Sequence, residues 1–210
     1  MSAPTFAAML QGFFTERLLR QMRASSNTVS GYRDTFRLLI RYATDRLKKA
    51  PSDLALEDLE PSLVIDFLDY LEVGRGNTTR TRNNRLAAIR SFFRYVAVSE
   101  PAHALRCQRM LALPQKRSRK TAIEFLQREE VEALVAAPDP STWLGRRDRA
   151  LLLLMVQTGL RVSELTSLRG NSVVLGAGAH VQCEGKGRKR RCTPLRRDVV
   201  KALSVWIDEQ

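Results

Sequence analysis

A short polar run near the middle of the chain constrains the fold more than any other feature of the sequence. Residues 113–121 read LPQKRSRKT, with one proline and four basic side chains in the five positions 116–120. A stretch of this composition is typical of a linker between domains. The sequence therefore predicts a first domain over residues 1–111, a basic linker over residues 112–121 and a second domain over residues 122–210.

The region before the linker has a helical pattern throughout. Apolar residues recur with the period of a helix, and capping residues and polar breaks lie where one helix would end and the next begin. Helices are predicted over residues 5–23, from the capping turn at 25–27 to Lys49, over residues 61–73 and over residues 78–97, with a short fifth after Pro101. We expect this domain to be entirely helical.

The region after the linker changes period part of the way along. Helices are predicted over residues 126–137, 143–157 and 162–168, with Gly159 in the left-handed conformation that closes the second of them. Three short strands and a final helix follow, over residues 173–175, 179–184, 190–195 and 197–207. The predicted fold class is mostly α, with a small three-stranded sheet in an α+β second domain.

The charge balance favours a polyanionic partner. Lys and Arg outnumber Asp and Glu by 35 to 22, which gives a formal charge of +13. Nucleic acid is the first candidate, although a soluble protein that is merely basic remains an alternative. No run approaches the ~18 apolar residues of a membrane span, and the N-terminus does not resemble a signal peptide, so we expect a cytoplasmic protein without membrane contact.

The cysteines give no sign of a disulfide framework or a metal. There are three, an odd count without framework spacing, so reduced thiols are expected. His180, Cys183 and Cys192 could be drawn as zinc ligands, but a structural zinc site needs four ligands at tighter spacing. No metal is expected.

The helix predicted over residues 78–97 has one apolar and one basic face. Leu86, Ile89, Phe93 and Val96 share the first face, which we expect to be buried. The opposite stripe has no acidic residue, includes an asparagine and is shallow at Ala87, features that suit a helix facing a DNA groove. A solvated basic face is the alternative. The candidate DNA-binding residues on it are Arg80, Asn83, Arg90 and Arg94.

Two other segments supply further candidates for DNA binding. Arg37 and Arg41 lie on the outer side of the helix that begins near residue 27, although Asp34 and Asp45 dilute the positive charge there. Thr28 lies at the N-terminus of that helix, where a hydroxyl and backbone N–H groups can bind a phosphate. The basic linker residues are expected to add affinity without reading sequence; they are Lys116, Arg117, Arg119 and Lys120.

A cation stands at an unfavourable place in the segment 157–165, QTGLRVSEL. Arg161 lies at a predicted helix N-terminus, where the macrodipole disfavours positive charge by up to about 1 kcal/mol. A residue that breaks a local rule often belongs to a site. The alternative is an ordinary ion pair between Arg161 and Glu164 on one helix face, which would stabilise the helix by only ~0.2–0.5 kcal/mol.

A second basic motif lies at the predicted tip between two strands. Residues 184–191 read EGKGRKRR, so Lys186 is flanked by two glycines that suit a tight turn. The motif lacks the spacing of a Walker A phosphate loop, and a charged hairpin without chemistry is the alternative.

Taken together and in this order, these motifs resemble those of the tyrosine recombinase, or phage integrase, family. Residues 158–165, TGLRVSEL, resemble its first arginine box, and residues 185–187 with the following basic residues and Thr193-Pro194-Leu195 resemble its lysine hairpin. Residues 27–33 and 84–95 are similar to parts of its N-terminal domain. The resemblance covers nearly the whole chain. It implies a helical, SAM-like core-binding domain over residues 1–111 and the N-terminal part of a catalytic domain over residues 122–210.

The resemblance also implies roles for individual residues. Arg161 would grip the scissile phosphate and stabilise charge in the transition state, and Glu164 would support it. Lys186 would act as a general acid toward the leaving hydroxyl. Arg188 and Lys189, which follow it, are further candidate DNA-binding residues. The implied partners are double-stranded DNA and other recombinase protomers on it, with no cofactor.

The match departs from the family pattern in one respect. The family's His-x-x-Arg box, a further His or Trp and its tyrosine nucleophile lie downstream of the lysine hairpin, whereas the four tyrosines of this sequence all precede residue 96. His103-Ala104-Leu105-Arg106 matches that box in letters but comes before the first arginine, so we interpret it as coincidence. We expect an incomplete catalytic domain without a nucleophile.

Three functions remain open on this basis. The chain could take part in DNA recombination or integration if another region supplied the missing box, or it could be an inactive DNA-binding protein that competes for recombination sites. A basic RNA-binding or ribosome-associated protein would explain the charge but neither motif.

Overall fold

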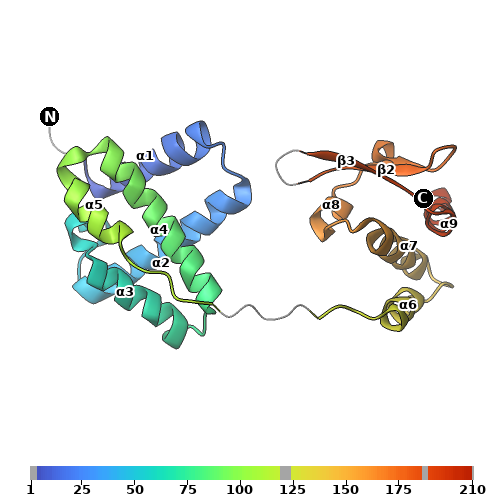
Figure 1. Cartoon of the computed structure of the whole chain (residues 1–210), viewed down its shortest axis with the longest axis horizontal. Helices are drawn as coiled ribbons and strands as arrows, with labels where there is room; N and C mark the ends of the chain where they lie inside the picture. Colours follow the sequence, from blue (N-terminus) through green and yellow to red (C-terminus); the bar gives the residue numbers. More distant parts are fainter. Residues whose placement is uncertain (1–3, 119–123, 186–188, 210) are drawn as a thin grey trace. The chain divides into compact units, whose positions relative to one another are not determined.

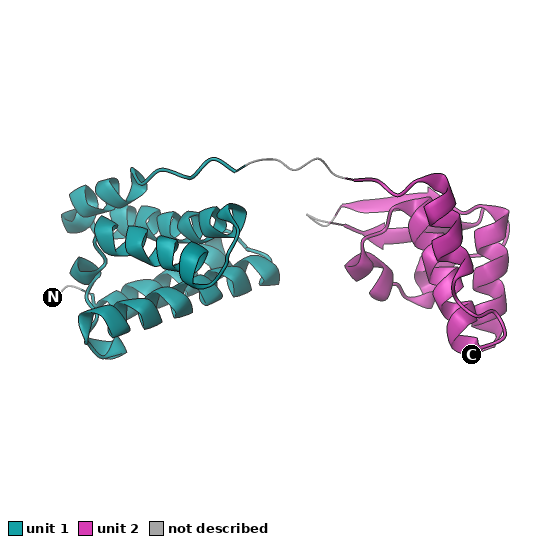
Figure 2. Cartoon of the chain, turned by 90° about the horizontal axis from the view of Figure 1, so that it is seen from below, with its two compact units in different colours: residues 1–121 teal, residues 122–210 magenta. Residues whose placement is uncertain are grey.

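The computed structural model describes residues 4–118, 124–185 and 189–209. The chain forms two compact units, residues 1–121 and residues 122–210, which are coloured separately in Figure 2. We call them unit 1 and unit 2 and describe each by itself.

Unit 1 consists of helices and turns in its described part (Figure 1). Its α-helices are α1 (Phe6–Gly12), α2 (Ser26–Leu47), α3 (Pro61–Asp69), α4 (Thr79–Ser99) and α5 (Ala104–Leu111). π-helical turns extend α1 over Phe13–Gln21 and α3 over Tyr70–Gly74, and short 3-10 turns occupy Pro51–Asp53, Leu56–Asp58 and Pro101–His103.

Local sequence signals set the ends of these helices. The hydroxyl of Thr5 accepts a hydrogen bond from the N–H of Ala8 at the start of α1. The Ser25 hydroxyl accepts a hydrogen bond from the N–H of Thr28 at the start of α2. The Thr78 hydroxyl accepts one from the N–H of Thr81 at the start of α4. Each cap satisfies a backbone donor that has no partner within the helix. The helices expected from the sequence are therefore confirmed, with bounds that differ by a few residues.

The core of unit 1 is built around aromatic side chains. The Phe92 ring, on α4, meets the Phe36 and Phe13 rings edge to face, with centroids 5.3 and 5.6 Å apart. Phe6 packs on the same ring at 5.9 Å. All four are buried, together with Leu86, Ile89, Phe93 and Val96, as the apolar face of this helix predicted. α4 therefore runs through the core rather than over it.

Unit 2 combines helices with a small sheet. Its elements are α6 (Arg128–Ala136), α7 (Trp143–Thr158), α8 (Val162–Thr166), a 3-10 turn at Gly170–Ser172, β1 (Val173–Val174), β2 (His180–Glu184), β3 (Arg190–Pro194) and α9 (Arg197–Asp208). The sheet is antiparallel in the order β1-β2-β3 and pairs Cys183 with Arg191. The expected mostly helical fold with a three-stranded sheet is confirmed.

The core of unit 2 is small and lies between α7, α8, α9 and the sheet. Leu154, Leu165, Val181 and Val199 are among its buried residues. Gly159 ends α7 with φ +61°, a left-handed conformation that strongly favours glycine, and so turns the chain directly into α8. This turn fixes where Arg161 begins the next helix.

Among the helices that the structure describes, none is long and apolar enough to cross a membrane.

Candidate functional site

Arg161 and Glu164 form a pair at the start of α8. Glu164 accepts a hydrogen bond from the backbone N–H of Arg161 at Oε2 (2.8 Å) and one from Arg161 Nη1 at Oε1 (3.0 Å). The Glu164 side chain is only 7% exposed, whereas that of Arg161 is 65% exposed. The ion pair between Arg161 and Glu164, which was the alternative interpretation of the sequence, is thus present. It still leaves the guanidinium group accessible to an anion.

A second arginine reaches the same carboxylate from the sheet. Arg191, on β3, donates from Nη2 to Glu164 Oε2 (2.8 Å) and from Nε to Cys183 Sγ (3.0 Å). Arg191 was missed as a site residue when only the sequence was considered. The pairing of β2 with β3 contained a signal for its position. Arg191 pairs with the buried Cys183, and cross-strand partners face the same side of a sheet.

These contacts keep Glu164 ionised. The hydrogen bond from the Arg161 backbone lowers the pKa of the Glu164 carboxyl, and the charges of Arg191 and Arg161 act in the same direction against the opposing effect of burial. The pKa of Arg191 is raised, first by its hydrogen bond to Cys183. One carboxylate therefore holds two guanidinium groups at neutral pH.

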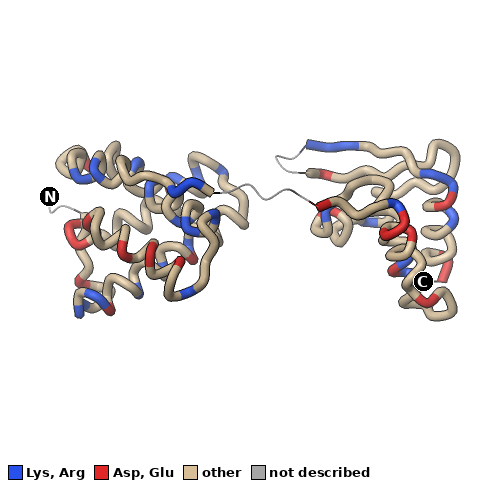
Figure 3. Tube along the Cα trace, turned by 60° about the horizontal axis from the view of Figure 1, so that its bottom comes forward, with Lys and Arg blue, Asp and Glu red and all other residues tan. Residues whose placement is uncertain are grey.

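The described ends of the lysine hairpin lie beside this cluster. The N–H of Gly185 donates to the carbonyl of Lys189 (2.9 Å), which closes the base of the loop. A Cβ on Gly185 would lie 3.1 Å from Glu164 Oε1, so a glycine permits the close approach. Lys186 and Arg188, two of the candidate residues, lie outside the described residues. Lys189 is exposed at the start of the basic run that continues into β3 (Figure 3).

The basic stripe on α4 is only partly free. Arg80 and Arg94 are exposed. Arg90 is half-buried, and its Nη2 donates to the carbonyl of Leu113. Asn83 exchanges two hydrogen bonds with the backbone of Lys116, at 2.8 and 3.2 Å. The expectation that Arg90 and Asn83 point freely outward was wrong, because the segment that follows α5 packs along this side of α4.

The start of the predicted linker is anchored to unit 1. The ammonium group of Lys116 pairs with Asp69 (3.0 Å) and with Glu72. The hydrogen bond from Lys116 lowers the pKa of the Glu72 carboxyl, and the pKa of Lys116 is raised in return. Lys116, which we expected to add affinity for DNA from the linker, is therefore held on unit 1 by two carboxylates. Arg117 is exposed, and Arg119 and Lys120 lie outside the described residues.

The candidates on α2 differ in how free they are. The N–H and hydroxyl groups of Thr28 both meet the hydroxyl of Ser25, at 3.3 and 3.0 Å. Arg37 is exposed and lies 3.4 Å from Asp34. Arg41 makes no ion pair with another described residue, so it is the candidate on α2 whose charge is least compensated.

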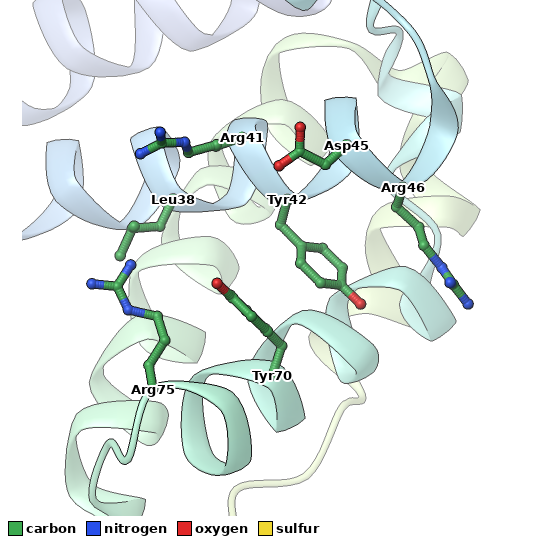
Figure 4. A pocket seen from close by; sticks show the side chains of 7 residues that line it. All are labelled: Leu38, Arg41, Tyr42, Asp45, Arg46, Tyr70 and Arg75. Atoms are coloured by element: carbon green, nitrogen blue, oxygen red, sulfur yellow. The ribbon is translucent and has the colours of Figure 1, made fainter.

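Arg41 lines an open cleft of about 530 Å³ between α2 and the segment that follows α3. Figure 4 shows its guanidinium group and that of Arg75 reaching toward the same end of the cleft, with the Tyr70 hydroxyl directed toward Arg75. Arg46 lines the other end, and Asp45 is the one acidic residue in the lining. Arg46 and Arg75 were missed from the sequence because α2 and the loop containing Arg75 meet only in the folded unit.

Comparison with known proteins indicates the same family for both units. Residues 124–210 match the phage integrase family, and residues 12–99 match the phage integrase N-terminal SAM-like domain. The putative integrase/recombinase y4rC of Sinorhizobium fredii is 50% identical over 98% of this chain, and y4rD of the same organism is 44% identical over 97%. The chain spans 62% of the length of y4rC and 73% of that of y4rD.

Solved structures share the fold at lower identity. A lambda integrase dimer bound to a core site matches 98% of this chain and 69% of its own, with a TM-score of 0.67 and 19% identity. The XerH recombinase bound to its difH substrate matches 89% of this chain and 54% of its own, with a TM-score of 0.63 and 20% identity.

Proposed function

This chain belongs to the phage integrase family of tyrosine site-specific recombinases, and from that premise we propose that it binds duplex DNA and contacts a backbone phosphate through Arg161. The observation that carries the proposal is the contrast within one ion pair. The carboxylate of Glu164 is buried and accepts hydrogen bonds at both oxygens, while the guanidinium group that it orients is exposed. A guanidinium fork held in this way suits the oxygens of a phosphate.

Arg161 would stabilise the charge that develops on the phosphate during strand exchange, with Glu164 as its support. A preorganised cation of this kind acts most strongly on the transition state, because its orientation is fixed before the reaction. Lys186 would donate a proton to the leaving hydroxyl, and Arg188 and Lys189 would contact the neighbouring backbone. The position of Gly185 against Glu164 supports a common site for the two motifs.

Unit 1 would supply most of the affinity for the duplex. Arg80 and Arg94 on α4 and Arg41, Arg46 and Arg75 around the cleft are the exposed cations that favour backbone contacts. Arg37, Thr28 and the basic residues that follow Lys116 would add weaker contacts. The lambda integrase and XerH structures are of recombinases on DNA, and the former is a dimer, which supports DNA and other protomers as partners.

The covalent step needs groups that we do not find at matching positions in these 210 residues. Strand exchange by this family needs a nucleophile near the phosphate, and the tyrosines of this sequence all lie in unit 1. Residues 1–210 would thus bind DNA and polarise a phosphate, and strand exchange would need a nucleophile in addition to the residues named here.

A nicked suicide substrate tests this proposal. The duplex is selected by the chain itself from a random pool, then nicked so that a covalent adduct would accumulate. We expect salt-sensitive binding, a weaker complex for Arg161→Ala, no such loss for the exposed control Arg197→Ala, and no adduct after denaturation. Failure to retain any duplex would refute the proposal, and a covalent adduct would overturn the non-covalent role.

A further inference from the structure

We propose that Arg191 is a positioning residue that orients Glu164 and, through it, the guanidinium group of Arg161. The inference rests on the proposed function, because it gives Arg191 its purpose in a phosphate site. No motif in the sequence assigned a role to this residue.

The hydrogen bonds of Glu164 show how much depends on Arg191. Oε1 accepts from Arg161 Nη1, and Oε2 accepts from the Arg161 backbone and from Arg191 Nη2 (2.8 Å). Without Arg191, a buried carboxylate oxygen would keep only the backbone donor. The carboxyl group could then rotate about its last side-chain bond and release Arg161 from its present direction.

The geometry of a guanidinium group suits this place better than that of an ammonium group. Arg191 donates from Nε to Cys183 Sγ on β2 and from Nη2 to both Glu164 on α8 and, more weakly, the carbonyl of Gly159 (3.4 Å). One planar group thus joins the sheet, the end of α7 and the start of α8. A lysine could keep the charge but not this set of fixed directions.

The positive charge of Arg191 gives a second reason to assign it this positioning role. Arg161 and Glu164 alone form a neutral pair, in which the carboxylate competes with an incoming phosphate for the arginine. With Arg191 also bound to Glu164, the three side chains carry a net positive charge. The carboxylate is shared between two cations, so Arg161 stays attractive to an anion.

Arg191 also connects the arginine site to the lysine hairpin. It follows Lys189 by two residues, and Lys189 closes the loop by accepting from Gly185. The same β3 strand that carries Arg191 to Glu164 therefore sets the base of the loop containing Lys186.

Nuclear magnetic resonance of arginine side chains tests the positioning directly and without DNA. The variants are Arg191→Ala, Arg191→Lys and the control Arg190→Ala, a neighbour on β3 that is 88% exposed and only 3.9 Å from Glu184. We expect the Arg161 guanidinium signal to shift and broaden in Arg191→Ala, to recover in part in Arg191→Lys and to stay unchanged in Arg190→Ala. An unchanged Arg161 signal in Arg191→Ala, with the fold intact by circular dichroism, would overturn the proposal.

A double-mutant cycle on duplex affinity tests whether Arg191 acts through Arg161. We expect Arg191→Ala to weaken binding of the selected nicked duplex by about 3- to 10-fold, and to have little further effect when Arg161 is already alanine. Effects that multiply would mean that Arg191 acts independently. If Arg161→Ala leaves affinity unchanged, the phosphate site itself is refuted, while the resonance experiment still decides the orientation.

Discussion

Units 1 and 2 bury apolar side chains to very different extents. Among the described residues, the core cluster of unit 1 contains 24 buried side chains and that of unit 2 contains eight. The helix α6 of unit 2 has no buried residue at all, and Phe125, Leu144 and Val162 are largely exposed. Because buried apolar area is the main source of stability, unit 1 should be much the more stable of the two.

The two units also use their arginines differently. In unit 1, Arg85 and Arg90 bind backbone carbonyls of other segments, and Arg82 is buried beside Glu72. In unit 2, Arg161 and Arg191 meet at one carboxylate and the first stays exposed. Counting basic residues therefore overstates the cationic surface of unit 1 and says little about the site in unit 2.

Core substitutions should give the largest effect on stability and should show that the two units differ in how much destabilisation they tolerate. Leu154→Ala in unit 2 and Leu86→Ala in unit 1 each remove a buried leucine side chain and should cost ~2–5 kcal/mol. We expect the first to unfold unit 2 and the second to leave unit 1 folded, because only unit 1 has a large core. Both tryptophans lie in unit 2 and all four tyrosines in unit 1, so fluorescence during urea unfolding reports each unit. A single coincident transition would contradict the comparison.

The ion pairs of Glu72 with Lys116 and Arg82 should give a smaller, pH-dependent effect confined to unit 1. The pKa of Glu72 is lowered in the folded state, so its contribution is complete above its ordinary value of 4.5 and is lost as the pH falls through the folded pKa. Glu72→Gln should cost about 1–3 kcal/mol at pH 7 and less in acid. Urea unfolding followed by tyrosine fluorescence at pH 7 and pH 4 measures this difference. An equal cost at both values, or an equal cost for the exposed control Glu16→Gln, would argue against it.

Two neighbouring arginines on α4 should differ in stability by a smaller amount. Arg90→Glu loses the hydrogen bond to the Leu113 carbonyl and should destabilise unit 1 by about 1–2 kcal/mol. Arg94→Glu changes an exposed side chain and should cost less than about 0.5 kcal/mol. Thermal unfolding of the two variants compares them. Equal melting temperatures would mean that Arg90 is as free as the helical wheel suggested.

Local signals in the sequence were sufficient to predict most of the elements. Caps such as Thr5, Ser25 and Thr78, and the glycine after α7, act within a few residues, so they can be recognised without knowing the fold. The π-helical turns were not predicted, since their i+5 hydrogen bonds, such as that from Met22 N–H to the Arg17 carbonyl, leave no clear pattern in the apolar residues.

Long-range contacts could not be predicted in the same way. A helical wheel gives the direction of Arg90 from its own axis, but not the chain segment that crosses there, 23 residues later. The contact between Arg191 and Glu164 joins residues 27 apart on a strand and a helix. The roles of Arg161, Glu164 and Lys186 in DNA chemistry stay predictions that binding and cleavage experiments must test.

The central claim is that this chain binds duplex DNA through exposed arginines, and the salt dependence of binding tests it most directly, beginning with the arginines of unit 1 that should supply most of the affinity. The dissociation constant is measured by fluorescence anisotropy over a series of salt concentrations for the unmodified chain, for Arg80→Ala/Arg94→Ala and for the control Arg20→Ala, whose side chain is exposed and paired with Glu16. If each α4 arginine neutralises one phosphate, the double substitution should weaken binding and reduce the slope of log K against log salt by about 2, with no change for the control. A slope unchanged by the double substitution would contradict the account.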